Sequence, residues 1–115
     1  MNLEPQIAFA ARSDDPPALE IRINFGILAG RDATPAEIDD LARALLAHVQ
    51  DVSIVSEQHY EVGHGHEATV HQVRVAVDAV VLPEDEPELE LVTQQLLQAS
   101  AVWAEHCASV RHAEL

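Results

Sequence analysis

The sequence predicts an α+β fold built as a two-layer α/β sandwich, and three observations support this. Residues 19–28 alternate apolar and polar side chains, as a half-buried strand does. Residues 35–48 carry apolar side chains at helical spacing and follow a set of helix start signals. Two further strand-like segments are separated by a turn that contains glycine, which predicts a β-hairpin.

The chain has the size and composition of one globular domain. It contains 115 residues, of which 48% are hydrophobic, and this is enough to bury a core without disulfides. Only 3% are aromatic, so we expect a core of Val, Leu, Ile and Ala. We expect residues 18–115 to form a single α+β domain after an irregular N-terminal segment, residues 1–17. Within that segment, residues 6–11 would add a short edge strand.

The first strand and the helix after it follow from local patterns. Every second residue of the strand is apolar: Leu19, Ile21, Ile23, Phe25 and Ile27. In the helix, Thr34 is a natural N-cap, Pro35 suits the first helical position, and Glu37 completes a capping box.

The second half of the chain adds a hairpin and a helix. Residues 52–62 and 69–77 are predicted strands on either side of a glycine-containing turn. The acidic segment 83–87 opens a long helix, because acidic side chains stabilise the positive end of a helix dipole. The order is therefore β-α-β-β-α, with both helices on one sheet face and the third strand between the other two. This is a ferredoxin-like arrangement that lacks the last strand.

The strong acidity excludes several classes of partner. Twenty acidic residues stand against six basic ones, all Arg, so the net charge is −14. Nucleic-acid binding needs clustered Lys and Arg, and an anionic membrane would repel the chain, so neither partner is expected. The acidity serves solubility through self-repulsion, or it steers a basic protein partner toward the chain.

We also expect no targeting or membrane-spanning segment. No apolar run approaches the roughly 20 residues that cross a bilayer, and the N-terminus lacks the basic start of a signal peptide. We therefore expect a cytoplasmic location. The lack of Lys beside abundant Ala and Val is typical of GC-rich bacterial genomes, which bears on the source and carries no functional weight.

The sheet face opposite the helices is the first candidate site. By alternation it carries Glu20, Arg22, Asn24, Val55, Glu57, His59, Glu61, Val70, Gln72, Arg74 and Ala76. Such a mixture is typical of a solvated face, yet its apolar members also suit the centre of a homodimer contact, which open sheet edges would favour. A weaker alternative is a pocket for a small anionic ligand centred on Arg22, His59 and Arg74.

A group of histidines is the second candidate site. His64 and His66 lie at the tip of the predicted hairpin and could reach one zinc, nickel or copper ion. His59 and His71 belong to opposite faces by alternation, so they would not complete the site. A solvated tip is the preferred interpretation, and no cofactor is expected.

Catalytic patterns are weak in this sequence. Cys107 follows His106, but successive helical residues point about 100° apart, so they form no nucleophile–base pair. Cys107 is in line with Trp103 and Val110, which favours a buried core position. We expect a non-catalytic domain that acts by self-association or by binding a protein. The alternative is a domain, or a modest enzyme, that binds a small ligand or metal through the open face or the histidine tip.

Overall fold

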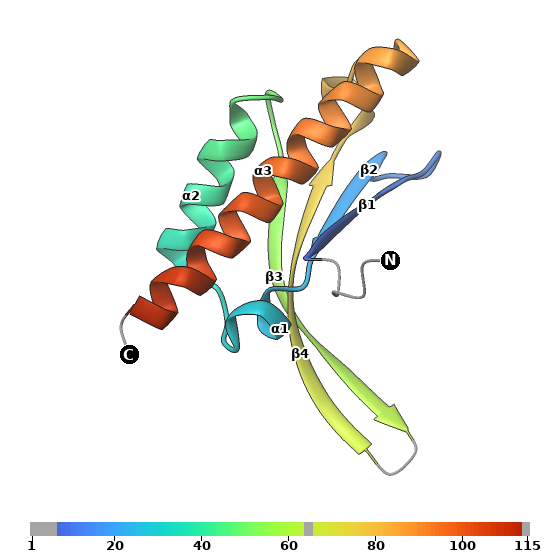
Figure 1. The fold of residues 1–115 in the computed structure, drawn as a ribbon. Coiled ribbons are helices and arrows are strands. Elements are labelled where there is room, and N and C mark those ends of the chain that lie inside the picture. The colour runs from blue at the N-terminus through green and yellow to red at the C-terminus, as the bar shows by residue number, and fades with distance from the viewer. Residues whose placement is uncertain (1–6, 64–65, 114–115) are drawn as a thin grey trace, which may run out of the picture.

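The computed structural model describes residues 7–63 and 66–113, with side chains described for residues 7–57 and 71–109. The fold is α+β, and Figure 1 shows the arrangement of its elements. In chain order these are β1 (Ala8–Arg12), β2 (Leu19–Ile23), α1 (Phe25–Ala29), α2 (Pro35–Leu46), β3 (Ser53–Gly63), β4 (His66–Val77), the 3₁₀ helix η1 (Ala79–Val81) and α3 (Glu86–Ala113).

The four strands form one antiparallel sheet in the order β1-β2-β4-β3. β4 lies between β2 and β3, as the sequence predicts for the third strand of the β-α-β-β-α unit. The predicted edge strand is also present, because β1 pairs with the outer side of β2 from Ala8↔Ile23 to Arg12↔Leu19. The sheet thus gains its fourth strand from the N-terminal segment, and the ferredoxin-like assignment stays a prediction.

The predicted first strand is too long, because β2 ends at Ile23 and the chain turns into α1. Gly26 explains the turn: a Cβ there would lie 2.8 Å from the backbone nitrogen of His71 and 2.9 Å from its carbonyl oxygen. α1 therefore packs against the backbone of β4, which only glycine allows. Helical spacing buries Phe25 and leaves Ile27 63% exposed, so the apparent alternation of these two residues was misleading.

The capping signals of α2 are confirmed. Thr34 Oγ1 accepts a hydrogen bond from the Glu37 amide at 3.2 Å, and Glu37 Oε1 accepts one from the Thr34 amide at 2.9 Å. The helix ends at Leu46, two residues before the predicted end, and the amides of His48 and Val49 both bond the Leu45 carbonyl. This closing turn leads directly into β3.

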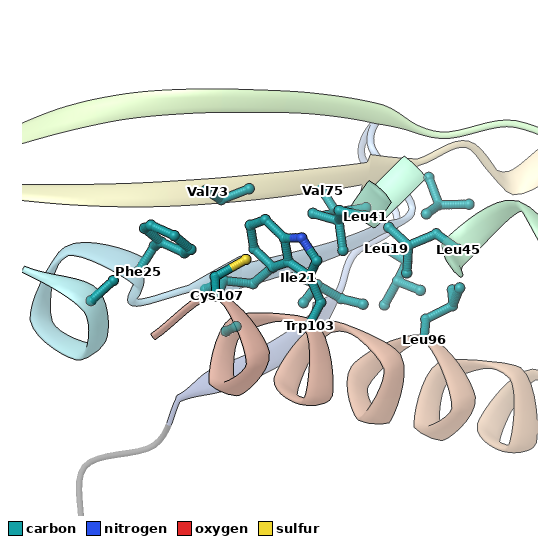
Figure 2. Close-up of a cluster of buried hydrophobic side chains, with 14 of the residues drawn as sticks. Leu19, Ile21, Phe25, Leu41, Leu45, Val73, Val75, Leu96, Trp103 and Cys107 are labelled. Carbon is teal, nitrogen blue, oxygen red and sulfur yellow. The ribbon is translucent and has the colours of Figure 1, made fainter. Parts of the chain in front are cut away.

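The core is aliphatic and lies between the helices and one face of the sheet. Figure 2 shows its side chains filling the space between α3 and the strands. The sheet contributes Leu19, Ile21, Ile23, Val73, Val75 and Val77, and the helices contribute Phe25, Leu41, Leu45, Leu96, Trp103 and Cys107. α2 and α3 both cover this face, as predicted, and the other face of the sheet carries no helix among the described residues (Figure 1).

The hairpin extends well beyond the four-stranded part of the sheet. β2 pairs with residues 73–77 of β4, while residues 66–72 pair with β3 alone among the described strands. The outer part of β3 and β4 is therefore a two-stranded ribbon, which projects past the helices (Figure 1). No helix in the described part of the chain has both the length and the apolar character needed to cross a membrane.

Candidate functional site

The candidate site is the sheet face that the helices leave uncovered, which we call the open face. We define it by the outward-facing residues of the four strands: Phe9, Ala11, Glu20, Arg22, Ser53, Val55, Glu57, Gln72, Arg74 and Ala76. Alternation within each strand puts them on this side, because Leu19, Ile21, Val73 and Val75 point into the core. The strand register aligns Phe9, Arg22, Arg74 and Val55 in one row across the sheet.

The centre of the open face is a cluster of four charged side chains. Arg22 and Arg74 lie directly opposite each other, and like charges in this position destabilise a sheet. Glu20 offsets this repulsion: its Oε1 lies 2.6 Å from Arg22 Nε, and its Oε2 lies 3.8 Å from Arg74 Nη1. Glu57 Oε1 lies 3.7 Å from Arg74 Nε. Two carboxylates and two guanidinium groups make this cluster electrically neutral.

These charged groups are partly shielded although no second layer of described residues covers them. The exposed fraction of each side chain lies between 20% for Glu20 and 36% for Arg22. Arg74 Nε is buried and has no hydrogen-bond partner among the described atoms, since 3.7 Å to Glu57 is an ion pair and too long for a hydrogen bond. The cluster therefore retains an unused donor at the centre of the face.

Apolar and neutral polar groups surround the cluster. Phe9 and Val55 end the central row on the two outer strands and are 37% and 43% exposed. On the next row Gln72 Nε2 donates a hydrogen bond to Asn24 Oδ1 at 2.8 Å. Gln72 Oε1 is buried and lacks a hydrogen-bond partner in the described structure. The open face thus combines apolar ends, a neutral charged centre and polar atoms with spare hydrogen-bonding capacity.

Of the three residues of the predicted anion pocket, Arg22 and Arg74 are described with their side chains and His59 by its backbone. Arg22 and Arg74 are neighbours, but carboxylates already lie close to both, so an anion would have to compete with Glu20 and Glu57. His59 lies opposite Val70 in the ribbon, and its side chain is outside the described residues. The anion pocket stays a prediction.

The histidine tip also lies largely outside the described residues. His64 is not among the described residues, and His66 is placed by its backbone alone, at the start of β4 opposite Gly63. His71 is half-buried, and its Nδ1 contacts Asp32 Oδ1 in the loop before α2. Among the described residues, no three or more His, Cys, Asp or Glu side chains gather to hold a metal ion. The metal site at His64 and His66 therefore stays a prediction.

On the helix-covered side, the structure contains a charged cluster that sequence reasoning missed. Arg31 donates from Nη1 and Nη2 to the two carboxylate oxygens of Glu37, at 2.7 and 2.8 Å. The Arg31 guanidinium also lies 5.5 Å from the centre of the Phe25 ring, a cation–π contact. Trp103 Nε1 donates to the Glu37 carbonyl at 2.8 Å. This cluster joins the start of α2 to α3 and has a structural role.

The same cluster sets the chemistry of Cys107. Burial, followed by the adjacent Glu37 carboxylate, raises the pKa of the Cys107 thiol from 9.0 to about 12. The Arg31 hydrogen bonds hold the pKa of Glu37 at about 2, so its carboxylate stays charged beside the thiol. Cys107 is 2% exposed, which matches its predicted core position.

We predict that Cys107 is unreactive in the folded protein. Raising a thiol pKa from 9.0 to about 12 lowers the thiolate fraction at pH 8 roughly a thousandfold, and burial further limits access. A thiol reagent such as DTNB should modify the native protein at least ~100-fold more slowly than the denatured protein. The matched control is a Cys107→Ala, Ser109→Cys variant, whose cysteine replaces an exposed serine on the same helix. Equal rates for the native wild-type and control proteins would contradict the prediction.

These features define the class of the molecule: a small α+β protein whose sheet has one face covered by helices and one face open. Comparisons with protein-family models, with curated proteins and with solved structures find no match to this chain.

Proposed function

We propose that this domain is non-catalytic and acts by self-association, with the open face meeting the same face of a second copy. The observation that carries this proposal is charge. The chain has a net charge of −14, so two copies repel each other over most orientations. The cluster of Glu20, Arg22, Glu57 and Arg74 is neutral, so two open faces repel each other less than the acidic surfaces do.

The chemistry of the open face also suits contact with itself. A twofold dimer places the same surface on both sides, so each guanidinium can face a carboxylate of the partner. Arg74 Nε, which lacks a hydrogen bond among the described atoms, would gain an acceptor from the partner. Phe9 and Val55 would lose their exposure to water, which contributes about 25 cal/mol per Å² of apolar surface buried.

The ribbon provides a second argument for association. A two-stranded hairpin alone is marginally stable in water, and the outer parts of β3 and β4 have no third strand among the described residues. The same two strands carry Val55, Glu57, Gln72 and Arg74, so the ribbon continues the strands of the open face. A second copy on that face would lie next to the ribbon and shield it.

We also infer that the sandwich is a variant of the ferredoxin-like arrangement. The unit from β2 to α3 has the predicted β-α-β-β-α order, and β1 lies beside β2, on the edge where the missing last strand would pair. A cytoplasmic location and a bacterial source remain expectations from composition.

The proposal predicts a dimer that a single charge reversal on the open face disrupts. Light scattering after size exclusion should give twice the 12.5 kDa chain mass for the wild type at micromolar concentration. Arg74→Glu makes the open face net acidic, and we expect at least tenfold weaker dimerisation. Arg43→Glu is the matched control, because Arg43 lies on α2 with a side chain that is 78% exposed.

A second variant separates loss of contact from loss of folding. Val55→Glu adds a negative charge at an exposed position of the open face, and Val102→Glu adds one at an exposed position of α3. We expect the first to weaken the dimer and the second to leave it intact, while circular dichroism stays unchanged in both. A wild-type chain that remains monomeric would contradict the proposal, as would equal effects of the two valine changes.

A second candidate function is the binding of a small anion by Arg22 and Arg74, favoured by Arg74 Nε, which has no hydrogen-bond acceptor among the described atoms. A ligand that binds only the folded state raises the melting temperature, and the rise grows with the logarithm of the ligand concentration over Kd. Inorganic phosphate should then stabilise the wild type and leave Arg74→Gln unaffected. An equal response of both proteins would exclude this candidate.

A further inference from the structure

A groove with several aliphatic residues lies away from the open face, where the end of α2 meets the start of α3. Its volume is about 470 Å³, and six of its ten lining residues carry large aliphatic side chains: Leu46, Val49, Leu82, Val92 and, on η1, Val80 and Val81. Val80 is 87% exposed and Leu46 is 49% exposed. Large aliphatic groups that gather in one exposed groove mark an interaction site more often than isolated ones do.

The surroundings of the groove are acidic. Asp51 and Glu84 are exposed and directly follow lining residues in the chain, and the exposed Asp78 lies two residues before Val80. A second depression shares Leu82 and Pro83 with the groove, and Asp14, Glu84 and Glu86 line it. The one basic residue there, Arg12, is paired with Glu86 at 2.6 Å. Neither Lys nor Arg lines the groove itself.

We propose that this groove binds a short segment of a partner protein that carries aliphatic side chains next to Lys or Arg. The apolar lining would supply the buried centre of the contact, since well-packed apolar anchors carry most of the energy of an interface. The acidic rim would attract the basic side chains and orient the segment. A second copy of this chain fits poorly, because its net charge of −14 would meet the acidic rim.

The proposal is tested with a defined probe. The probe is a capped 14-residue helical peptide with Leu on one face and Lys on the other, at roughly three to four Leu per two turns. The matched probe carries Glu in place of every Lys. We expect the Lys peptide to bind and to change the NMR chemical shifts of the protein only at residues around Leu46 and Val80. The Glu peptide should bind at least tenfold more weakly.

Two pairs of variants locate the site on the protein. Val80→Ser on η1 should weaken binding of the Lys peptide at least fivefold. Val102→Ser, at an exposed valine of α3 outside the groove, should leave binding unchanged. The triple change Asp51→Asn, Asp78→Asn and Glu84→Gln should weaken binding and reduce its dependence on salt. The control triple, Asp15→Asn, Asp39→Asn and Glu105→Gln, removes the same charge at exposed positions outside the groove.

Each other outcome would overturn the proposal. Absence of binding by the Lys peptide would exclude the proposed partner chemistry. Shifts spread over the acidic surface, with the same affinity for both triple variants, would indicate non-specific attraction by net charge. A Val80→Ser change that weakens dimerisation of the protein itself would assign the groove to a second copy instead.

Discussion

Replacing Trp103 with Ala lowers the free energy of unfolding by about 3–5 kcal/mol, the largest single effect that we expect from this structure. Trp103 is 7% exposed, and its ring lies 5.2 Å from that of Phe25. Its Nε1 also donates to the Glu37 carbonyl at 2.8 Å. The change therefore leaves a cavity between α1, α2 and α3 and removes a bond that joins α3 to α2.

Trp103→Phe separates the contribution of ring packing from that of the hydrogen bond to Glu37. Phe refills much of the volume but has no donor for the Glu37 carbonyl, so it should cost only about 1–2 kcal/mol. Trp103 is the only tryptophan, so unfolding in urea should be followed by circular dichroism and not by fluorescence. Equal losses for Ala and Phe would show that packing of the ring contributes little.

Replacing Glu37 with Gln lowers stability by about 2 kcal/mol at pH 7, the second largest effect that we expect. The Arg31 hydrogen bonds, followed by those from Thr34 and Cys107, hold the pKa of Glu37 at about 2, below its ordinary value of 4.5, although burial opposes the shift. Gln lacks the charge that binds Arg31. It also leaves a guanidinium whose side chain is only 29% exposed without its carboxylate.

The effect depends on pH in a defined direction. The pKa of Glu37 is lower in the folded state, so its contribution is fully present above pH 4.5 and is lost as pH falls to about 2. The stability difference between wild type and Glu37→Gln should therefore shrink toward zero across that window. Asp40→Asn is the control: the Asp40–Arg43 pair is exposed, so its loss should cost less than about 0.5 kcal/mol. A constant difference between pH 7 and pH 2 would contradict the assignment.

The candidate site could be predicted in outline but not in its pairings. Alternation within each strand is enough to put Arg22, Arg74, Glu57 and Val55 on one face, since side chains of a strand point to opposite sides in turn. The register between strands brings Arg22 opposite Arg74 and puts Glu20 within reach of both. Register depends on the packing of the whole sheet, so the neutral cluster was not visible in the sequence.

Local signals were sufficient to determine the start of α2 and the buried faces of β2 and β4. The capping box at Thr34 and Glu37 marks the start of α2 because both partners lie within one helical turn of each other. The alternation in β2 and β4 marks the buried face because each strand contributes its own apolar residues. In such elements the stabilising interactions join residues that are close together in the chain, so the sequence pattern alone is sufficient to predict them.

The tertiary structure decided the rest. Residues 25–29 alternate like the end of a strand, yet they form α1 because Gly26 lets the chain pack against the backbone of His71. Trp103 joins the Arg31–Glu37 pair only in the folded chain, because it lies 66 positions beyond Glu37. Contacts between distant segments form when the elements pack together, so no local sequence pattern predicts them. Composition led us to expect neither nucleic acid nor membranes as partners, whereas the open face and the groove between α2 and α3 exist only in the folded chain.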